Sequence, residues 1–238
     1  MKKIEKSEMT ISEHLQELRT RLFICTISFA IVAVFAFYAF DFFWPFILLP
    51  LKNSSAVNLV NLSPAEGISV SLLVASLIAI LLTSPIFLYH LYAFCAPAVQ
   101  NNRRIFLFAF FAACILFFAG GAFAYFFAIP LLFHFLANYS ESITQLWSQT
   151  SYVSFLFRFE ILFAILFQLP VAAAFFAQTG IADRRFLLRH FRLILFLIAF
   201  LSAFFTPPDL LSLFWMAIPL SLLYLLSLLT YHLAWRKR

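Results

Sequence analysis

Long, uninterrupted apolar runs are the feature that most restricts the folds open to this chain. A helix needs roughly 20 apolar residues to cross a bilayer. Five runs approach or exceed that length: Leu22–Phe43, Ile68–Val99, Ile105–Leu136, Tyr152–Gln178 and Leu210–His232. Hydrophobic residues make up 64% of the chain and charged residues 11%, whereas soluble domains are about half apolar and a quarter charged. A soluble fold could not cover so much apolar surface, so the sequence predicts a membrane protein.

A sixth run, Leu193–Phe205, is short, because at helical rise it covers only about 20 Å of a hydrocarbon core about 30 Å thick. It could begin near Phe186 if Arg189 and Arg192 extend toward the interface. We therefore predict an all-α integral membrane protein in which residues 1–22 form an N-terminal segment, 23–232 the transmembrane domain and 233–238 a tail. Its six spans are predicted at about 23–43, 68–99, 105–136, 152–178, 187–205 and 210–230.

Basic residues indicate the orientation of these spans. They precede the first span, join the second to the third and the fourth to the fifth, and end the chain; with six spans, all these segments lie on one side. The only basic residue in the loops on the other side is Lys52. By the positive-inside rule both termini are predicted to be cytoplasmic, and Arg103 and Arg104 anchor a cytoplasmic loop. The rule also accounts for the net charge of +6, so no nucleic-acid partner is expected.

The segment "TISEHLQELRTRL" precedes the first span and has apolar residues at helical spacing. It predicts an amphipathic helix that lies along the cytoplasmic surface and runs into the first span. Thr10 and Glu13 form a capping-box pattern. Glu17, on the polar face, and Arg21 are four residues apart, in the order that favours an ion pair.

On the opposite side, the interrupted stretch Pro50 to Gly67 predicts a small cap folded on the outer membrane surface. Within it, a helix is expected to begin after Ser63, with Pro64 at its first position and Glu66 in its first turn.

The fourth apolar run contains three polar groups, Arg158, Glu160 and Gln168. Ionisable groups inside a membrane are costly and are candidates for function. Arg158 lies near the outer end, and its spacing from Glu160 puts the two on different helix faces. Gln168 either forms a hydrogen bond to a neighbouring helix or binds substrate. It could also satisfy a carbonyl group that Pro170 leaves unpaired.

Other features predict structure and not chemistry. The small-residue patch "AGGAFA", Ala119 to Ala124, favours close helix approach, and prolines within the apolar runs predict kinks. The five histidines are scattered singly, the three cysteines lie inside apolar runs, and the sequence has no nucleotide-binding motif. The sequence therefore favours neither an enzyme nor a metal or cofactor site.

Several motifs occur in a fixed order from Ile11 to about Leu220. They are "HLQELRTRL" before the first span, "LLPL" after it, "SPAE" before the second and "SPIFLYHLYAFCAPAV" at its end. The later ones are "FAYFFAIPLLFHFL" in the third span, "YVSFLFRF" and "FQLPVA" in the fourth, and "TPPD" between the last two. Together with six spans, this ordered set resembles the TatC family, the core receptors of the twin-arginine translocase.

The resemblance implies a concave, glove-like arrangement of six helices, the last two short, in the bacterial cytoplasmic (inner) membrane. It implies a subunit that binds folded precursors through their Arg-Arg signal peptides. Such a subunit nucleates translocon assembly with TatA-like and TatB-like single-span proteins, self-associates, and works by the proton-motive force without a cofactor. A six-helix small-solute transporter or channel is the alternative. Transporters typically show inverted repeats, and the sequence has no internal repeat.

The resemblance also assigns candidate site residues. Signal-peptide binding is expected at the cytoplasmic side: Glu17, Arg19, Phe94, Pro97, Asn102, Arg103 and Arg104. Intramembrane or partner-helix contacts are expected at Tyr125, Arg158, Glu160 and Gln168. The periplasmic cap is expected to involve Pro50, Glu66 and Asp209.

Two of these positions depart from the family pattern. Asn102 stands where the family has a second glutamate for the arginine pair, and Gln168 stands where many members have glutamate. A carboxylate pairs bidentately with guanidinium, and Asn102 brings no charge. The first cytoplasmic loop is therefore more basic than the pattern. Either Glu17 carries most of the recognition, or the signal peptides here deviate.

Overall fold

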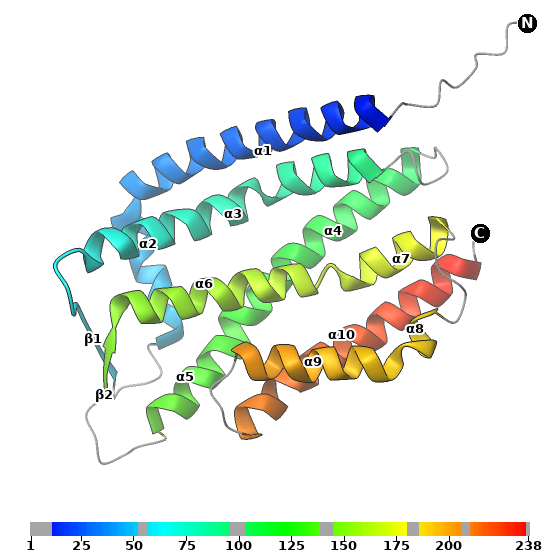
Figure 1. Ribbon diagram of the computed structural model, residues 1–238. Helices are drawn as coiled ribbons and strands as arrows, with labels where there is room; N and C mark the ends of the chain where they lie inside the picture. Colours follow the sequence, from blue (N-terminus) through cyan, green and yellow to red (C-terminus); the bar gives the residue numbers. More distant parts are fainter. Residues whose placement is uncertain are drawn as a thin grey trace, which may run out of the picture.

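A computed structural model describes residues 11–51, 57–95, 103–138, 145–179, 186–205 and 210–236. These ranges are helical apart from two short strands and a few turns, which confirms the predicted all-α membrane fold (Figure 1). In chain order the elements are α1 (Ile11–Tyr38), α2 (Phe40–Ile47), η1 (Leu49–Leu51), β1 (Val57–Val60), α3 (Glu66–Cys95), α4 (Arg103–Phe123), η3 (Ala124–Ala128), α5 (Ile129–Asn138), β2 (Gln145–Ser148), α6 (Gln149–Leu166), α7 (Leu169–Thr179), α8 (Phe186–Arg189), α9 (Phe191–Phe205) and α10 (Leu210–Arg236).

Within these ranges, five helical stretches are long and apolar enough to cross a membrane: Ser12–Tyr38, Glu66–Phe94, Leu107–Ala137, Gln149–Thr179 and Met216–Trp235. The shorter apolar helix α9 corresponds to the predicted fifth span. A turn at His190 separates it from α8, so the two do not form one longer helix. Which residues lie in the hydrocarbon layer, and the glove-like outline, stay predictions.

The first span differs from the sequence prediction at both ends. The amphipathic segment and the apolar run form one unbroken helix, α1, so the segment continues the direction of the span and does not turn aside from it (Figure 1). The helix ends at Tyr38, and the chain turns at Ala39 into α2, whereas the apolar run predicted a span to about residue 43. Hydropathy shows that a run of residues is apolar. It does not show where the chain changes direction within that run.

Two spans are interrupted next to proline, as the sequence predicted. In the third, the π-helical turn η3 separates α4 from α5, directly before Pro130. In the fourth, α6 ends at Leu166 and α7 starts at Leu169, directly before Pro170. Proline lacks an N–H group and its ring clashes with the preceding turn, so a break or a π-bulge relieves the conflict. By contrast, α3 and α10 continue through Pro85 and Pro219.

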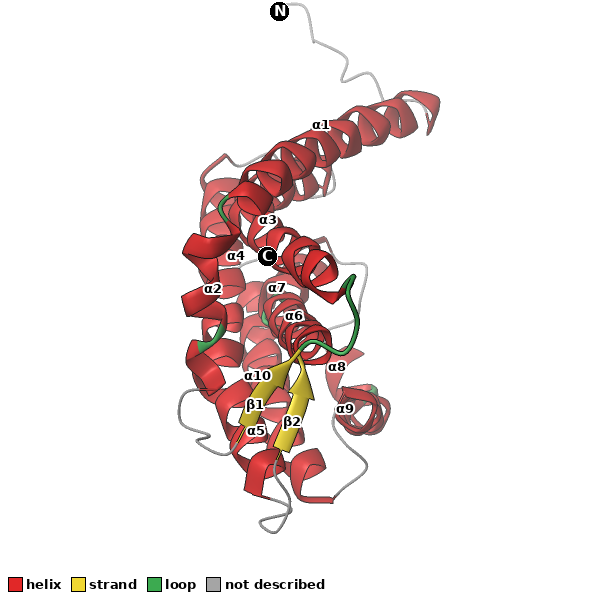
Figure 2. Cartoon of the chain, turned by 90° about the vertical axis from the view of Figure 1, so that its left-hand side faces the viewer, coloured by secondary structure: helices red, strands yellow, loops and turns green. Residues whose placement is uncertain are grey.

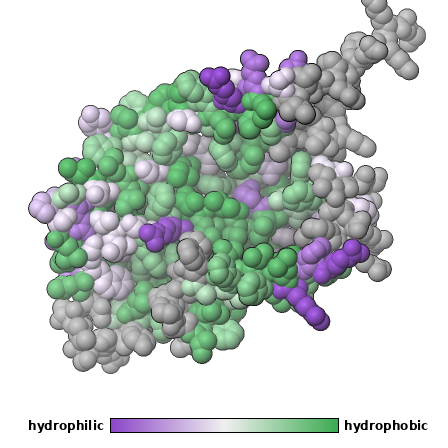
Figure 3. All heavy atoms as spheres, viewed as in Figure 1, coloured by the Kyte–Doolittle hydropathy of each residue, from purple (hydrophilic) through white to green (hydrophobic). Residues whose placement is uncertain are grey.

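The helices pack side by side in a curved array. The helix α1 runs alongside α3, α6 contacts both α3 and α4, and α10 packs on α7 and α9 (Figures 1 and 2). Apolar residues cover most of the described part of the face in Figure 3. Many large apolar side chains are exposed, among them Phe35, Phe108 and Phe126. Such exposure suits a lipid environment and would be a liability in water.

The two glycines of the small-residue patch lie where α4 meets α6, which confirms the predicted close approach. A β-carbon on Gly120 would lie 2.6 Å from the Phe163 carbonyl oxygen, and one on Gly121 would lie 3.0 Å from Oε2 of Glu160. Only glycine lets the two backbones come this close.

A parallel pair of short strands, which the sequence did not predict, joins the segment between η1 and α3 to the segment between α5 and α6. The strand β1 pairs with β2, and Val57 lies opposite Gln145 (Figure 2). Each strand has four residues, too few for a sequence pattern to reveal.

Candidate functional site

The strongest candidate site lies where the start of α1 meets the end of α3. We call it the α1–α3 junction and define it by His14, Glu17, Arg21, His90 and Phe94. The helical spacing of the first three puts them on one side of α1. The packing of α1 along α3 then brings this side against the last turns of α3.

Glu17 is the centre of the junction. Nε of Arg21 donates a hydrogen bond of 3.0 Å to Oε1 of Glu17. A second guanidinium nitrogen, Nη2, donates to the same oxygen. Through Nη1, Arg21 also reaches the His90 carbonyl oxygen at 3.4 Å, which ties α1 to α3. The predicted pair of Glu17 and Arg21 is thus confirmed, with an added link between helices.

The second carboxylate oxygen of Glu17 is available as a hydrogen-bond acceptor. Oε2 is buried and, within the described residues, accepts no hydrogen bond. Nδ1 of His14 lies 3.8 Å from this oxygen. The His14 ring stacks on Phe94, with centroids 4.1 Å apart and planes 15° from parallel. The junction therefore holds a carboxylate that binds one guanidinium and has a further acceptor beside an aromatic stack.

The structure places the predicted signal-peptide residues unevenly. Phe94 lies in the junction with Glu17, whereas Arg19 is exposed on another face of α1. Glu17 is 27% exposed and partly enclosed, not fully on the open polar face that helical periodicity predicted. Arg103 and Arg104 begin α4, and their side chains are not described. Pro97 and Asn102 lie outside the described residues.

Sequence reasoning missed the two histidines of the junction. His14 and His90 looked like isolated residues because they are far apart in the chain. The spacing of His14 and Glu17, three residues on one helix, was the available signal for half of the arrangement. Nothing local links His90 or Phe94 to α1, since the packing of two helices decides that contact.

A second polar cluster lies at the opposite end of the helices, around Glu66. The side chain is 5% exposed. Its Oε1 accepts hydrogen bonds from the Ser148 hydroxyl and, at 2.9 Å, from the Thr150 N–H. Its Oε2 accepts from the Leu62 N–H. Three donors suit an ionised carboxylate, which only accepts. Glu66 thus lies in the first turn of α3, as predicted, although the helix starts at Glu66 and Pro64 lies in the preceding turn, not at the first helical position. The side chain also joins α3 to the start of α6.

Two tyrosines fasten the same end to α2. The Tyr152 hydroxyl donates to the Ile47 carbonyl oxygen at 2.6 Å. The Tyr125 hydroxyl donates to the neighbouring carbonyl of Phe46. Pro50, in η1, is buried, and Asp209 lies outside the described residues. These contacts hold this end of the helices together and offer no evident chemistry.

The polar residues within the fourth span occupy different environments. Arg158 is exposed and Glu160 is 4% exposed, so they do not share a face, as predicted. Nε2 of Gln168 donates at 3.1 Å to the Ala113 carbonyl oxygen of α4 and lies 3.5 Å from that of Ala164. In the described part of the chain, the Gln168 amide donates to these two carbonyls and not to the Leu166 carbonyl, which Pro170 leaves without its helical donor. Gln168 therefore bonds a neighbouring helix of its own chain, the first of the two readings from sequence.

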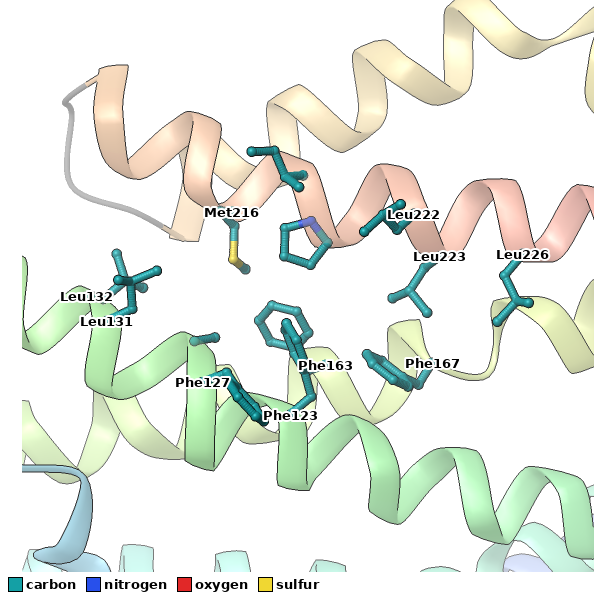
Figure 4. A pocket seen from close by; sticks show the side chains of 13 residues that line it. Phe123, Phe127, Leu131, Leu132, Phe163, Phe167, Met216, Leu222, Leu223 and Leu226 are labelled. Atoms are coloured by element: carbon teal, nitrogen blue, oxygen red, sulfur yellow. The ribbon is translucent and has the colours of Figure 1, made fainter.

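An apolar cavity of about 480 Å³ lies between the kinked third span, α6 and α10. Figure 4 shows Met216 and Leu223 of α10 facing Phe123 and Phe163 across it. The lining has no charged side chain, so the cavity suits an apolar group. Among the described residues, no group of histidine, cysteine or acidic side chains could hold a metal ion.

Comparison with known proteins gives a consistent result. A family model described as "Sec-independent protein translocase protein (TatC)" matches residues 13–219. The chain is 35% identical over 222 residues to TatC of Helicobacter pylori, with 92% of this chain and 86% of the relative covered. It is 34% identical over 224 residues to TatC of Campylobacter jejuni, with 91% of each chain covered.

A solved structure is also similar in fold. It is the crystal structure of the twin-arginine translocase receptor TatC. It superposes with a TM-score of 0.84 at 30% identity, and the match covers 93% of this chain and 99% of the other.

Proposed function

Because this chain belongs to the TatC family of Sec-independent protein translocase proteins, we propose that it is the receptor subunit that binds Arg-Arg signal peptides. It is a component of the twin-arginine translocase, a protein-transport complex, and a multi-pass protein of the inner membrane. In the proposal, it binds folded precursors on the cytoplasmic side, where both termini lie. It then nucleates assembly with TatA-like and TatB-like partners, and transport uses the proton-motive force.

The observation that carries the proposal is the state of the Glu17 carboxylate. One oxygen already binds the Arg21 guanidinium, and the other has no hydrogen-bond partner among the described residues. An incoming arginine can donate to Oε2 without breaking the existing pair once the His14 ring moves aside. Charge-assisted bonds between arginine and carboxylate are about twice as strong as neutral ones. The Phe94 ring beside the carboxylate adds an apolar surface for a neighbouring signal-peptide residue.

Glu17→Gln tests this role. The amide keeps the size of the side chain and removes the charge, so crosslinking of an Arg-Arg precursor to the receptor should fall several-fold. Glu13→Gln is the matched control, because Glu13 is an exposed acid one turn earlier on the same helix. The control removes the same charge and should crosslink like the wild type. Equal crosslinking of Glu17→Gln and wild type would refute the assignment.

Family membership favours this function over the alternative of a small-solute transporter. The two still make different predictions: copurification with single-span partners supports the receptor, and saturable uptake of a small solute would support the transporter.

A further inference from the structure

Glu160 is a buried acid that the proposed receptor function does not use. It is the only acidic residue of α6 and α7, and its side chain is 4% exposed. It points at the glycine patch of α4, where a β-carbon on Gly121 would lie 3.0 Å from its Oε2. The same β-carbon would lie 3.8 Å from Leu81 of α3. The carboxyl group is therefore enclosed between three helices of its own chain and does not face a partner helix.

No cation neutralises this carboxyl group in the described part of the chain. Neither of the two ion pairs found there involves Glu160. Arg158 is two residues away and exposed on another face of α6. On α4, Arg103 and Arg104 begin the helix, about 25 Å from Gly121 at helical rise. On α3, Glu66 and Tyr89 lie about 22 Å and 12 Å along the helix from Leu81.

The hydroxyl groups of Tyr125 and Tyr152 donate their hydrogen bonds to backbone carbonyl groups and not to Glu160. Tyr125 interacts electrostatically with Glu160 and with Tyr152. Yet the Tyr125 hydroxyl donates to the Phe46 carbonyl, and that of Tyr152 to the Ile47 carbonyl. Each phenol oxygen can still accept a hydrogen bond and has no second proton to donate. Neither tyrosine hydroxyl therefore donates a proton to Glu160, so these two groups do not stabilise a carboxylate there.

An unpaired carboxylate buried in a membrane is strongly unfavourable, and such a group takes up a proton instead. We propose that Glu160 is an intramembrane proton-binding site, whose carboxyl group holds a proton at neutral pH between α6 and the glycine patch of α4. Gly121 seals the site, so exchange of the proton requires α4 and α6 to separate there. The site is independent of the signal-peptide junction, and it gives this chain a titratable group in the span where Gln168 is neutral.

Infrared spectroscopy tests the protonation state directly. A protonated carboxyl group has a carbonyl stretch well separated from the bands of carboxylates and amides, and the band shifts in heavy water. The full-length protein in lipid vesicles at neutral pH should show this band, and Glu160→Gln should lose it while keeping the shape of the side chain. The expected difference between the two spectra is the loss of one protonated carboxyl group per chain. If the difference spectrum instead shows the loss of carboxylate bands, the proposal is wrong.

Two glycine variants test the geometry. Gly121→Ala pushes a methyl group against Oε2 and should shift the carboxyl band without abolishing it. Gly67→Ala is the control, because a β-carbon there would meet no atom within 4 Å, and the band should stay in place. Glu160→Asp keeps a carboxyl group at the site and should retain a protonated band even if Glu160→Gln folds poorly. A Glu160→Asp protein without such a band would also overturn the proposal.

Discussion

Gly120→Ala is expected to force α4 and α6 apart at their closest approach. A β-carbon at this position would lie 2.6 Å from the Phe163 carbonyl oxygen and 2.9 Å from Cβ and Cγ of Phe167. The carbonyl oxygen belongs to the backbone of α6, so it cannot swing away as the end of a side chain can. One of the two helices must shift, and the packing around the contact loosens with it.

The magnitude follows from comparing neighbouring glycines. Overpacking of this kind costs about 1–3 kcal/mol. Alanine also favours a helix over glycine by about 0.8–1.0 kcal/mol, which partly offsets the clash. Gly121→Ala receives the same helical gain, but its β-carbon meets the end of a flexible side chain, Glu160. The difference between the two variants therefore isolates the clash. Gly120→Ala should be less stable than Gly121→Ala by about 1–3 kcal/mol.

The apparent melting temperature of the purified protein in detergent measures this difference. For a chain of this size, 1 kcal/mol corresponds to about 2–4 °C, so Gly120→Ala should melt about 2–12 °C below Gly121→Ala. Gly67→Ala should melt close to the wild type, because a methyl group there enters open space. If Gly120→Ala and Gly121→Ala melt together, the inferred close packing of α4 on α6 is wrong.

Three further predictions concern the polar residues. Glu66→Gln should lower the melting temperature more than Asp41→Asn, because Glu66 accepts three hydrogen bonds and Asp41 is exposed; equal melting of both would contradict this. Gln168→Leu should change stability by only about 0.6–2 kcal/mol, since it removes one in-membrane hydrogen bond, and should impair transport partly; unfolding of the variant would show a larger structural role. Asn102→Glu should strengthen binding of an Arg-Arg peptide by about 0.5–1 kcal/mol, a few-fold, with a smaller gain at high salt. Titrations at two salt concentrations measure that gain, and no gain at either would remove this loop from the recognition site.

Much of the architecture could be predicted from the sequence because the relevant signals are local. Hydropathy over about 20 residues determines whether a segment prefers a bilayer, so the apolar runs predicted the membrane-spanning stretches that the structure contains. Proline disrupts the helix in its own turn, which is why the breaks before Pro130 and Pro170 were predictable. The pair of Glu17 and Arg21 also follows from spacing within one helix.

The candidate site could be predicted only in part, for the same reason. Glu17 was identified by its motif, but its enclosure against α3 was not. The stacking of His14 on Phe94 and the bond from Arg21 to the His90 carbonyl join helices that are far apart in the sequence. These contacts depend on the angle and register at which α1 lies on α3, and no pattern within either helix encodes that register.

The amino-acid sequence by itself determined the class of protein, the helical segments and the family motifs, because each depends on residues close together in the chain. Tertiary packing alone decided which polar groups are enclosed and by what. Glu66 obtains a donor, Ser148, from 82 positions away, and Glu160 lies against Gly121 of another helix. A buried polar group is stabilised or strained by whatever atoms surround it, and in this protein those atoms come from distant segments that meet only when the helices pack.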